Sequence, residues 1–389
     1  MLDHVVKQPL NYKLVNFCIT NLISAIPWIG QVFLISFTLL INEIYMNLYR
    51  KVEFNKPVTK VTYIYNKFRY ATQCLINNKS FVHGVRNYST SNTSNSVKLD
   101  PDYVSGFIDA EASFTTVVYY KNRWCVNSVF KISLHRKDIE LLNSIQAFFG
   151  VGRITGSNNA DYRVERISDL ADYIIPHLDK YPLISKKKAD YELFKRIVFI
   201  MRDKLHLTDK GLQEIVNLKA SMNNGVSEVL LAEFPATIPV DRPIVKNPVL
   251  ADIRPNWLAG FTDGDGCFVI YVEKNTKLRS GFRVRLRFNI CQHIRDKSLL
   301  ETISSYLNCG SVLETSRGEI NFDVYKFSDN YEKILPFFTN YPLHGVKALD
   351  FNDWKLAAEI LKSKDHLTKE GIEKIIKIKS NMNKSRVAD

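Results

Sequence analysis

An internal duplication constrains the fold of this chain more than any other feature. HLTDKGLQEIVNLKASMN begins at His206, and HLTKEGIEKIIKIKSNMN begins at His366, 160 residues later. Two further pairs of segments are 160 and 158 residues apart, YPLISKKKADY with YPLHGVKALDF and FKISLHRKD with FNICQHIRD. Because the matches keep their order and almost keep their offset, we interpret the chain as two tandem copies of one structural unit.

Each copy shows the same order of expected elements. A short apolar helix is followed by runs in which apolar and polar residues alternate, as in FRVRLRFNI at 282–290, which predicts a strand with an apolar back and a largely cationic front. RDKSLLETISSYL has apolar residues at helical spacing. Shorter strands are expected at 161–167 and 321–327, and helices around 188–202 and 209–222. Each half is therefore α+β, in the order helix, hairpin, helix, hairpin, helices.

Two linkers divide the chain. Residues 88–98, YSTSNTSNSVK, are polar and low in complexity, which is typical of a linker. Residues 225–255 contain five prolines, and this density predicts an extended connection because proline blocks helix. The expected parts are thus an N-terminal segment (1–99), a first domain (100–224), the proline-rich linker and a second domain (256–389).

The N-terminal segment differs from the rest. Residues 18–41 carry no charge, and 24 such residues are enough to span a bilayer. The basic stretch at 50–98, with Glu53 as its one acid, would stay on the non-translocated side. The alternative interpretation is a buried helix, or a remnant of a fused sequence without a membrane role, and Pro27 favours it.

The net positive charge of the chain is weak evidence for nucleic-acid binding, because about half of it lies in the N-terminal segment. The net charge is +13, but residues 1–100 contain 11 Lys and Arg against 4 Asp and Glu, or +7, which leaves +6 for the other 289 residues. A nucleic-acid partner therefore requires a clustered basic face rather than bulk charge. No pair of the six cysteines has CxxC spacing, and none stands at metal-ligand distance from a histidine, so we interpret them as reduced thiols or small core residues and expect no zinc site: Cys18, Cys74, Cys125, Cys267, Cys291 and Cys309.

Two acidic motifs begin the repeats. VSGFIDAEA at 104–112 and LAGFTDGDG at 258–266 are 154 residues apart. Together with the HLT…MN and YPL…K…D segments, they resemble the LAGLIDADG homing endonucleases in their two-motif, single-chain form. The resemblance covers about residues 100–385. It implies two αββαββα repeats that form a pseudo-twofold monomer with saddle-shaped antiparallel sheets.

The motifs predict how the two halves meet. Small residues at Gly106, Ala259 and Gly260 allow two helices to approach backbone to backbone. We expect the acids at the sixth motif position, Asp109 and Asp263, to cap and orient the helix junction rather than to bind metal.

Pairing of these helices about a twofold axis brings together the acids at the eighth motif position, Glu111 and Asp265. Two such close carboxylates repel each other, and a divalent cation removes that cost. Oxygen ligands suit Mg²⁺, which also takes phosphate oxygens. The resemblance implies that the backbone carbonyls of Ala110 and Gly264 add ligands.

The resemblance also implies further catalytic side chains. Lys187 and Lys347 occupy matching places, where a lysine of this family lies beside the active site and would neutralise charge on the phosphate. Lys187 lies in a run of three lysines, so its register is open by one residue. Gln292 aligns with a residue that positions water, whereas Leu134 takes that place in the first half.

The polar fronts of the predicted strands are the expected nucleic-acid surface. Two twisted sheets side by side would fit the DNA major groove, where arginine reads guanine edges and lysine reaches phosphates. The alternative is an ordinary solvated sheet face. The residues that share the fronts are Asn127, Lys131 and Ser133 in the first half and Arg283, Arg285, Arg287 and Asn289 in the second.

Two functions follow from the resemblance. The first is an intron-homing endonuclease that uses Glu111, Asp265 and Mg²⁺ to hydrolyse one phosphodiester on each strand of DNA at an exon junction. The second is a maturase that assists splicing of its own group I intron RNA. Intact acids favour cleavage, whereas Glu at 111, Ala112 and Leu134 depart from the family pattern and favour the maturase. A DNA-binding regulator is a third possibility, without an added recognition domain in this sequence.

A stretch within the apolar segment bears on cellular location. ITNLISAIPWIGQ, residues 19–31, resembles a transmembrane stretch of cytochrome b. The resemblance implies an intron reading frame continuous with an upstream cytochrome b exon, as in fungal mitochondria. The matrix would then be the site of action, with the N-terminal part removed.

Overall fold

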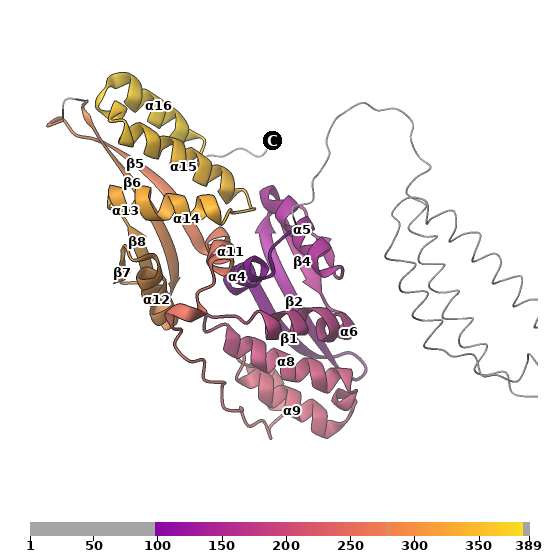
Figure 1. Ribbon diagram of the computed structural model, residues 1–389. Helices are drawn as coiled ribbons and strands as arrows, with labels where there is room; N and C mark the ends of the chain where they lie inside the picture. Colours follow the sequence, from indigo (N-terminus) through magenta and orange to yellow (C-terminus); the bar gives the residue numbers. More distant parts are fainter. Residues whose placement is uncertain (1–97, 279, 384–389) are drawn as a thin grey trace, which may run out of the picture. The chain divides into compact units, whose positions relative to one another are not determined.

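The computed structural model describes residues 98–278 and 280–383, which form an α+β unit with an internal repeat (Figure 1). The first repeat consists of α4 (Pro101–Glu111), β1 (Ala112–Tyr120), β2 (Trp124–His135), α5 (Ile139–Phe149), β3 (Arg153–Thr155), β4 (Asn159–Val164), α6 (Ile167–Asp169), α7 (Ile175–Lys180), α8 (Lys188–Arg202) and α9 (Asp209–Ala220).

The second repeat has the same order. It consists of α11 (Pro255–Asp265), β5 (Gly266–Lys274), β6 (Phe282–His293), α12 (Lys297–Leu307), β7 (Ser311–Glu314), β8 (Glu319–Val324), α13 (Phe327–Asp329), α14 (Leu335–Asn340), α15 (Lys347–Lys362) and α16 (Lys369–Ser380). The expected pair of αββαββα repeats, each closed by further helices, is confirmed.

Each repeat contains one antiparallel sheet of four strands. The strand orders are β1-β2-β4-β3 and β5-β6-β8-β7. The registers also match, since Phe130 of β2 lies opposite Phe114 and Val164, and Phe288 of β6 lies opposite Phe268 and Val324. The duplication therefore preserves strand pairing residue by residue.

Each sheet buries its apolar face under the helices of its own half. Leu286, Phe288 and Ile290 of β6 are buried, as the alternating pattern predicts. The two cores also exchange residues, because Ala259 of α11 packs in the first core and Ile184 packs in the second.

The motif helices α4 and α11 lie side by side at the centre, between the two sheets (Figure 1). A Cβ atom on Gly106 would lie 1.9 Å from the backbone oxygen of Trp257, and one on Gly260 would lie 2.0 Å from that of Tyr103. Such distances exclude any side chain. The helices therefore touch through their backbones at these two glycines.

Two local expectations are wrong. The linker contains helix α10 (Glu228–Glu233), because the first linker proline is Pro235 and the Ser227 hydroxyl caps the helix by accepting the Leu230 N–H at 3.3 Å. The strands expected at 161–167 and 321–327 begin two residues earlier and end three residues earlier, because β4 and β8 already pair with β2 and β6 at Asn159 and Glu319, and the chain turns helical from Ile167 and Phe327.

Several expectations lie outside the described residues, including the apolar stretch at 18–41, Cys18 and Cys74. Within 98–278 and 280–383, no helix combines the length and apolar character that a bilayer crossing requires. The other four cysteines, all in this part of the chain, are free thiols.

We predict that Gly260→Ala destabilises the fold by at least about 2 kcal/mol, because the new methyl group overlaps the Tyr103 carbonyl. Alanine would otherwise favour a helix by about 0.5–1 kcal/mol. Urea unfolding measures the effect. Gly318→Ala is the control, since Gly318 has a φ of +75° and no atom within 4 Å of a Cβ, so it should cost only about 1 kcal/mol. Equal costs would contradict the close approach.

A buried histidine predicts acid sensitivity. His177 Nε2 lies 3.0 Å from the Ser105 hydroxyl, and burial lowers its pKa to about 4 from an ordinary value near 6.5. The unfolded chain then binds a proton that the folded chain does not, so stability falls as the pH drops from about 6.5 to 4, by up to about 3 kcal/mol. Unfolding at several pH values tests this. His177→Gln should flatten the profile, and His135→Gln, at an exposed site, should leave it unchanged.

Candidate active site

The paired motif helices end on two carboxylates. Helix α4 ends at Glu111 and α11 at Asp265, and a strand begins at the next residue of each. A Cβ on Gly264 would lie 3.6 Å from Glu111 Oε1, so the Glu111 carboxylate lies against the last turn of α11. Burial raises the pKa of Glu111, and the neighbouring Asp265 raises it further. The structure thus brings the two acids together.

The two acids have different neighbours. Gln292 Nε2 donates to Asp265 Oδ2 at 2.5 Å, which opposes the rise that burial causes in the Asp265 pKa. In the first half Leu134 stands in the matching place and packs on the first core. Leu134 and Glu111 line one cavity of about 310 Å³. Glu111 therefore lacks the amide contact that holds Asp265.

A lysine ammonium group donates a hydrogen bond to a carbonyl in the last turn of each motif helix. Lys187 Nζ donates to the Ala110 carbonyl at 2.7 Å, and Lys347 Nζ donates to the Gly264 carbonyl at 2.6 Å. Lys187 is therefore the member of its lysine run that reaches the site. Burial lowers the pKa of both lysines, and the nearby acids oppose this change. Each carbonyl has a second lone pair, so it can accept the ammonium and still face a cation.

The sixth-position acids hold the loops that carry these lysines. Asp109 Oδ2 accepts the N–H groups of Ile184 at 2.6 Å and Ser185 at 3.1 Å, and Asp109 also accepts the Ser185 hydroxyl. Asp263 accepts the N–H groups of His344 and Gly345, both at 2.7 Å. Both acids are buried, and these bonds connect each motif helix to the loop that carries its lysine.

Sequence reasoning missed two aspartates beside the lysine loops. Asp138 Oδ1 accepts the Val346 N–H and Asp296 Oδ1 accepts the Lys186 N–H, both at 2.7 Å. Each bond joins one half to the other. The signal was present, because each acid closes one of the matched segments FKISLHRKD and FNICQHIRD.

Several residues on the polar front of the second sheet are engaged in contacts within the protein, which the sequence did not predict. Arg283 is exposed, but Arg285 pairs with Glu273 at 2.7 Å and Arg287 pairs with Asp323 at 2.6 Å. Asn289 is buried and also donates to Asp323, at 3.0 Å. Part of this front is therefore used inside the protein.

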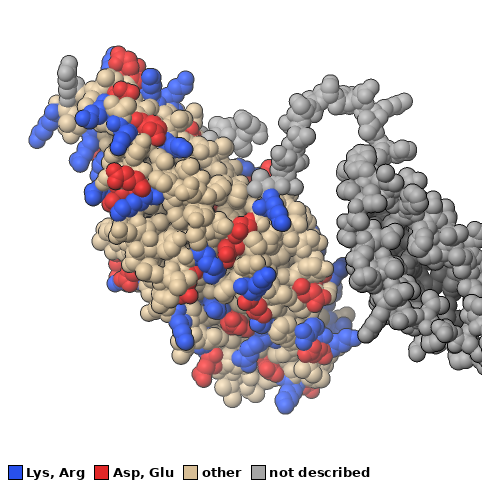
Figure 2. Space-filling model, viewed as in Figure 1, with Lys and Arg blue, Asp and Glu red and all other residues tan. Residues whose placement is uncertain are grey.

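The first sheet's front is similar. Ser133 donates to Asp161 at 2.6 Å, Lys131 lies 4.0 Å from the same carboxylate, and Asn127 is half-buried. On the face of the molecule in Figure 2, Lys and Arg are interspersed with Asp and Glu, in keeping with the modest net charge of this part of the chain.

Comparison with known proteins agrees with this geometry. The sequence profile of the family described as LAGLIDADG endonuclease matches residues 104–198 and 258–358, which are the two repeats. This chain belongs to the LAGLIDADG endonuclease family. The matched ranges include both motifs, both acids and both lysines.

Solved LAGLIDADG structures share the fold. The homing endonuclease I-SmaMI bound to cleaved DNA is 43% identical, with a TM-score of 0.72, over 75% of this chain and 99% of that one. I-GzeII in complex with its DNA target is 38% identical, with a TM-score of 0.70, over 74% of this chain and 100% of that one.

Two curated Neurospora crassa relatives are longer. Probable intron-encoded endonuclease 2 and Probable intron-encoded endonuclease 3 are each 37% identical, over 73% and 75% of this chain. The matches span 65% and 55% of those proteins, so this chain corresponds to only part of their length.

We predict that Arg287→Met lowers the free energy of unfolding by about 3 kcal/mol, because it leaves the buried Asp323 carboxylate, 8% exposed, without its cationic partner. Arg285→Met is the matched control, since its pair with Glu273 is 38% and 47% exposed and should cost less than about 1 kcal/mol. Urea unfolding of both variants measures the difference. Similar costs would show that Asp323 does not depend on Arg287.

Proposed function

We propose that this chain is a site-specific endonuclease that cuts both strands of DNA, with Glu111 and Asp265 as its catalytic acids. The observation that carries the proposal is the meeting of these acids at the ends of two paired helices, each helix closed by a buried lysine. I-SmaMI, which shares the fold at 43% identity, is described as bound to cleaved DNA and, at uncleaved target, in the presence of calcium ions.

The donor set at the helix ends fits Mg²⁺. Two carboxylates and two backbone carbonyls are hard oxygen donors. Burial and the neighbouring Asp265 both raise the pKa of Glu111, and a bound cation would stabilise the two ionised acids. Glu111 and Asp265 would hold the ion, with the carbonyls of Ala110 and Gly264. In the described part of the chain no group of three or more His, Cys, Asp or Glu side chains is arranged for a metal, so water and DNA phosphate would complete the ligands. Bound Mg²⁺ polarises a phosphate and lowers the pKa of water.

The remaining side chains support hydrolysis. The ammonium groups of Lys187 and Lys347 would neutralise charge that develops on each scissile phosphate. Gln292 would orient Asp265 and a nearby water through its amide. DNA would lie along the strand fronts, where exposed Arg283 and half-buried Asn127 and Lys131 would reach base edges and phosphates.

Intron homing in mitochondria is the biological setting we propose, with an exon junction as the target. Both N. crassa relatives are named intron-encoded endonucleases. A Podospora anserina relative, 43% identical over 118 residues, is named as a protein in ND4 intron 1. A cytochrome b-like stretch at 19–31 supports the same setting.

A maturase function is the second candidate. The specific observation that favours it is Leu134, which leaves Glu111 without the amide partner that Asp265 has. One acid is thus less well oriented for cleavage, while the fold and its basic residues remain available to intron RNA.

We predict that the full chain with Mg²⁺ makes a staggered double-strand cut in DNA that spans its intronless exon junction. Asp265→Asn should lower the rate at least about a thousandfold, because it removes the charge that holds the cation. EDTA should abolish cutting. Products resolved on denaturing gels measure both strands, and Asp203→Asn, at an exposed acid, should cut at the wild-type rate. No cut, with faster splicing of the intron RNA, would instead support the maturase.

A further inference from the structure

We propose that Asp138 and Asp296 are positioning residues that act across the interface between the two repeats, here called the seam. Each aspartate holds the lysine loop of the opposite half. The lysine loops are residues 184–187 and 344–347. The catalytic consequence rests on the proposed endonuclease function, whereas the contacts themselves do not.

The first lysine loop is held by carboxylates from both halves. The N–H groups of Ile184 and Ser185 donate to Asp109 of the same half. The next N–H, of Lys186, donates to Asp296 of the second half at 2.7 Å. Three consecutive amides thus bind two acids on opposite sides of the seam.

The second loop repeats this arrangement with the halves exchanged. The N–H groups of His344 and Gly345 donate to Asp263 of their own half. The following N–H, of Val346, donates to Asp138 of the first half at 2.7 Å. An interaction that recurs at both symmetry-related positions, between residues 110 and 208 apart in sequence, is a property of the fold and not an isolated contact.

Each cross-seam bond lies one residue before an active-site lysine. A charge-assisted hydrogen bond from a backbone N–H to a carboxylate is about twice as strong as a neutral one, so it fixes the chain at the start of α8 and α15, where Lys187 and Lys347 lie. Asp296 is 3% exposed, and Asp138 lines the cavity that also contains Glu111 and Lys347. A displacement of about 1 Å at a catalytic group can lower a rate about a hundredfold, so this fixation matters for the lysine's position.

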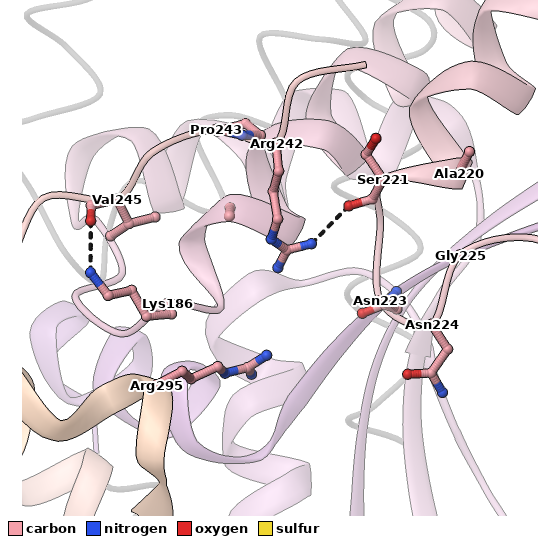
Figure 3. A pocket seen from close by; sticks show the side chains of 11 residues that line it. Lys186, Ala220, Ser221, Asn223, Asn224, Gly225, Arg242, Pro243, Val245 and Arg295 are labelled. Carbon is pink, nitrogen blue, oxygen red and sulfur yellow. Dashed lines mark hydrogen bonds between the residues drawn. The ribbon is translucent and has the colours of Figure 1, made fainter. Parts of the chain in front are cut away.

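The two loops differ in their remaining support. Lys186 Nζ donates to the Val245 carbonyl at 2.7 Å (Figure 3) and to Asn247 Oδ1 at 3.0 Å, so the linker also holds the first loop. Arg295 lines one pocket together with Lys186 and Val245, and it pairs with Asp296 at 3.4 Å. Val346 replaces Lys186 in the second loop and has no ammonium to make such bonds. The second loop therefore depends more on its aspartate.

Hydrogen exchange of the full chain, read by mass spectrometry, tests the contacts without any substrate. Asp138→Ala should speed exchange of peptides covering 344–347 at least tenfold and leave 184–187 unchanged, whereas Asp296→Ala should do the reverse with a smaller change. Asp203→Ala is the control, since this exposed acid touches neither loop. Faster exchange of both loops alike, or of the loop in the mutated half, would overturn the proposal.

Strand-resolved cleavage tests the consequence. Each DNA strand is labelled separately. Asp138→Ala should lower the cleavage rate of the same strand as Lys347→Ala does, and Asp296→Ala that of the same strand as Lys187→Ala does, each at least tenfold. Asp138→Asn keeps an acceptor oxygen and should recover most of the rate. Equal slowing of both strands, or pairing with the lysine variant of the same half, would mean a merely structural role. If the wild-type chain cuts no DNA, the proposed function fails, while the exchange result still decides the contacts.

Discussion

The close contact of two helices at Gly106 and Gly260 determines the rest of the structure. At each glycine, a backbone carbonyl of the other helix occupies the space that a Cβ atom would need. Only this separation brings the ends of α4 and α11 together, and the acids stand at those ends. A side chain at either glycine would force the helices apart and carry Glu111 and Asp265 with them. Packing at the seam and chemistry at its end are therefore one geometric requirement.

This geometry gathers like charges, and the surrounding residues balance them. Burial and proximity raise the pKa of Glu111, while burial lowers the pKa of Lys187 and Lys347. Each lysine also satisfies the last carbonyls of its own motif helix, which would otherwise add partial negative charge beside the acids. The site thus joins two carboxylates and two ammonium groups in one place, an arrangement that a phosphate and a cation can enter without leaving an unpaired buried charge.

Local and repeated sequence patterns predict much of this structure. They do not predict contacts between segments that are distant in the sequence. The constant offset predicts two similar halves, and alternation predicts which face of 282–290 is buried. The partners of the front residues were not predictable, because Asp323 reaches Arg287 and Asn289 only through the β6–β8 register. Asp138 and Asp296 were missed for the same reason, since neither lies near its partner in sequence. The number of prolines predicted an extended linker, but helix α10 forms within it. A proline count describes the linker as a whole, whereas this helix needs only six residues without proline.

The two copies differ in several side chains around the candidate site. Gln292 corresponds to Leu134 in the first half, and Val346 corresponds to Lys186. Tyr103 donates its hydroxyl to Asp263 at 2.5 Å, but its counterpart Trp257 has an indole N–H without a partner in the described structure. The backbone contacts that position both lysines remain equivalent. Equivalent backbone contacts with unlike side chains keep the frame symmetric and make the two half-sites chemically different. Under the proposed endonuclease function, such a frame suits a DNA target whose two halves differ in sequence, since each repeat can adapt its side chains to one half of the target while the shared seam maintains the spacing between the acids.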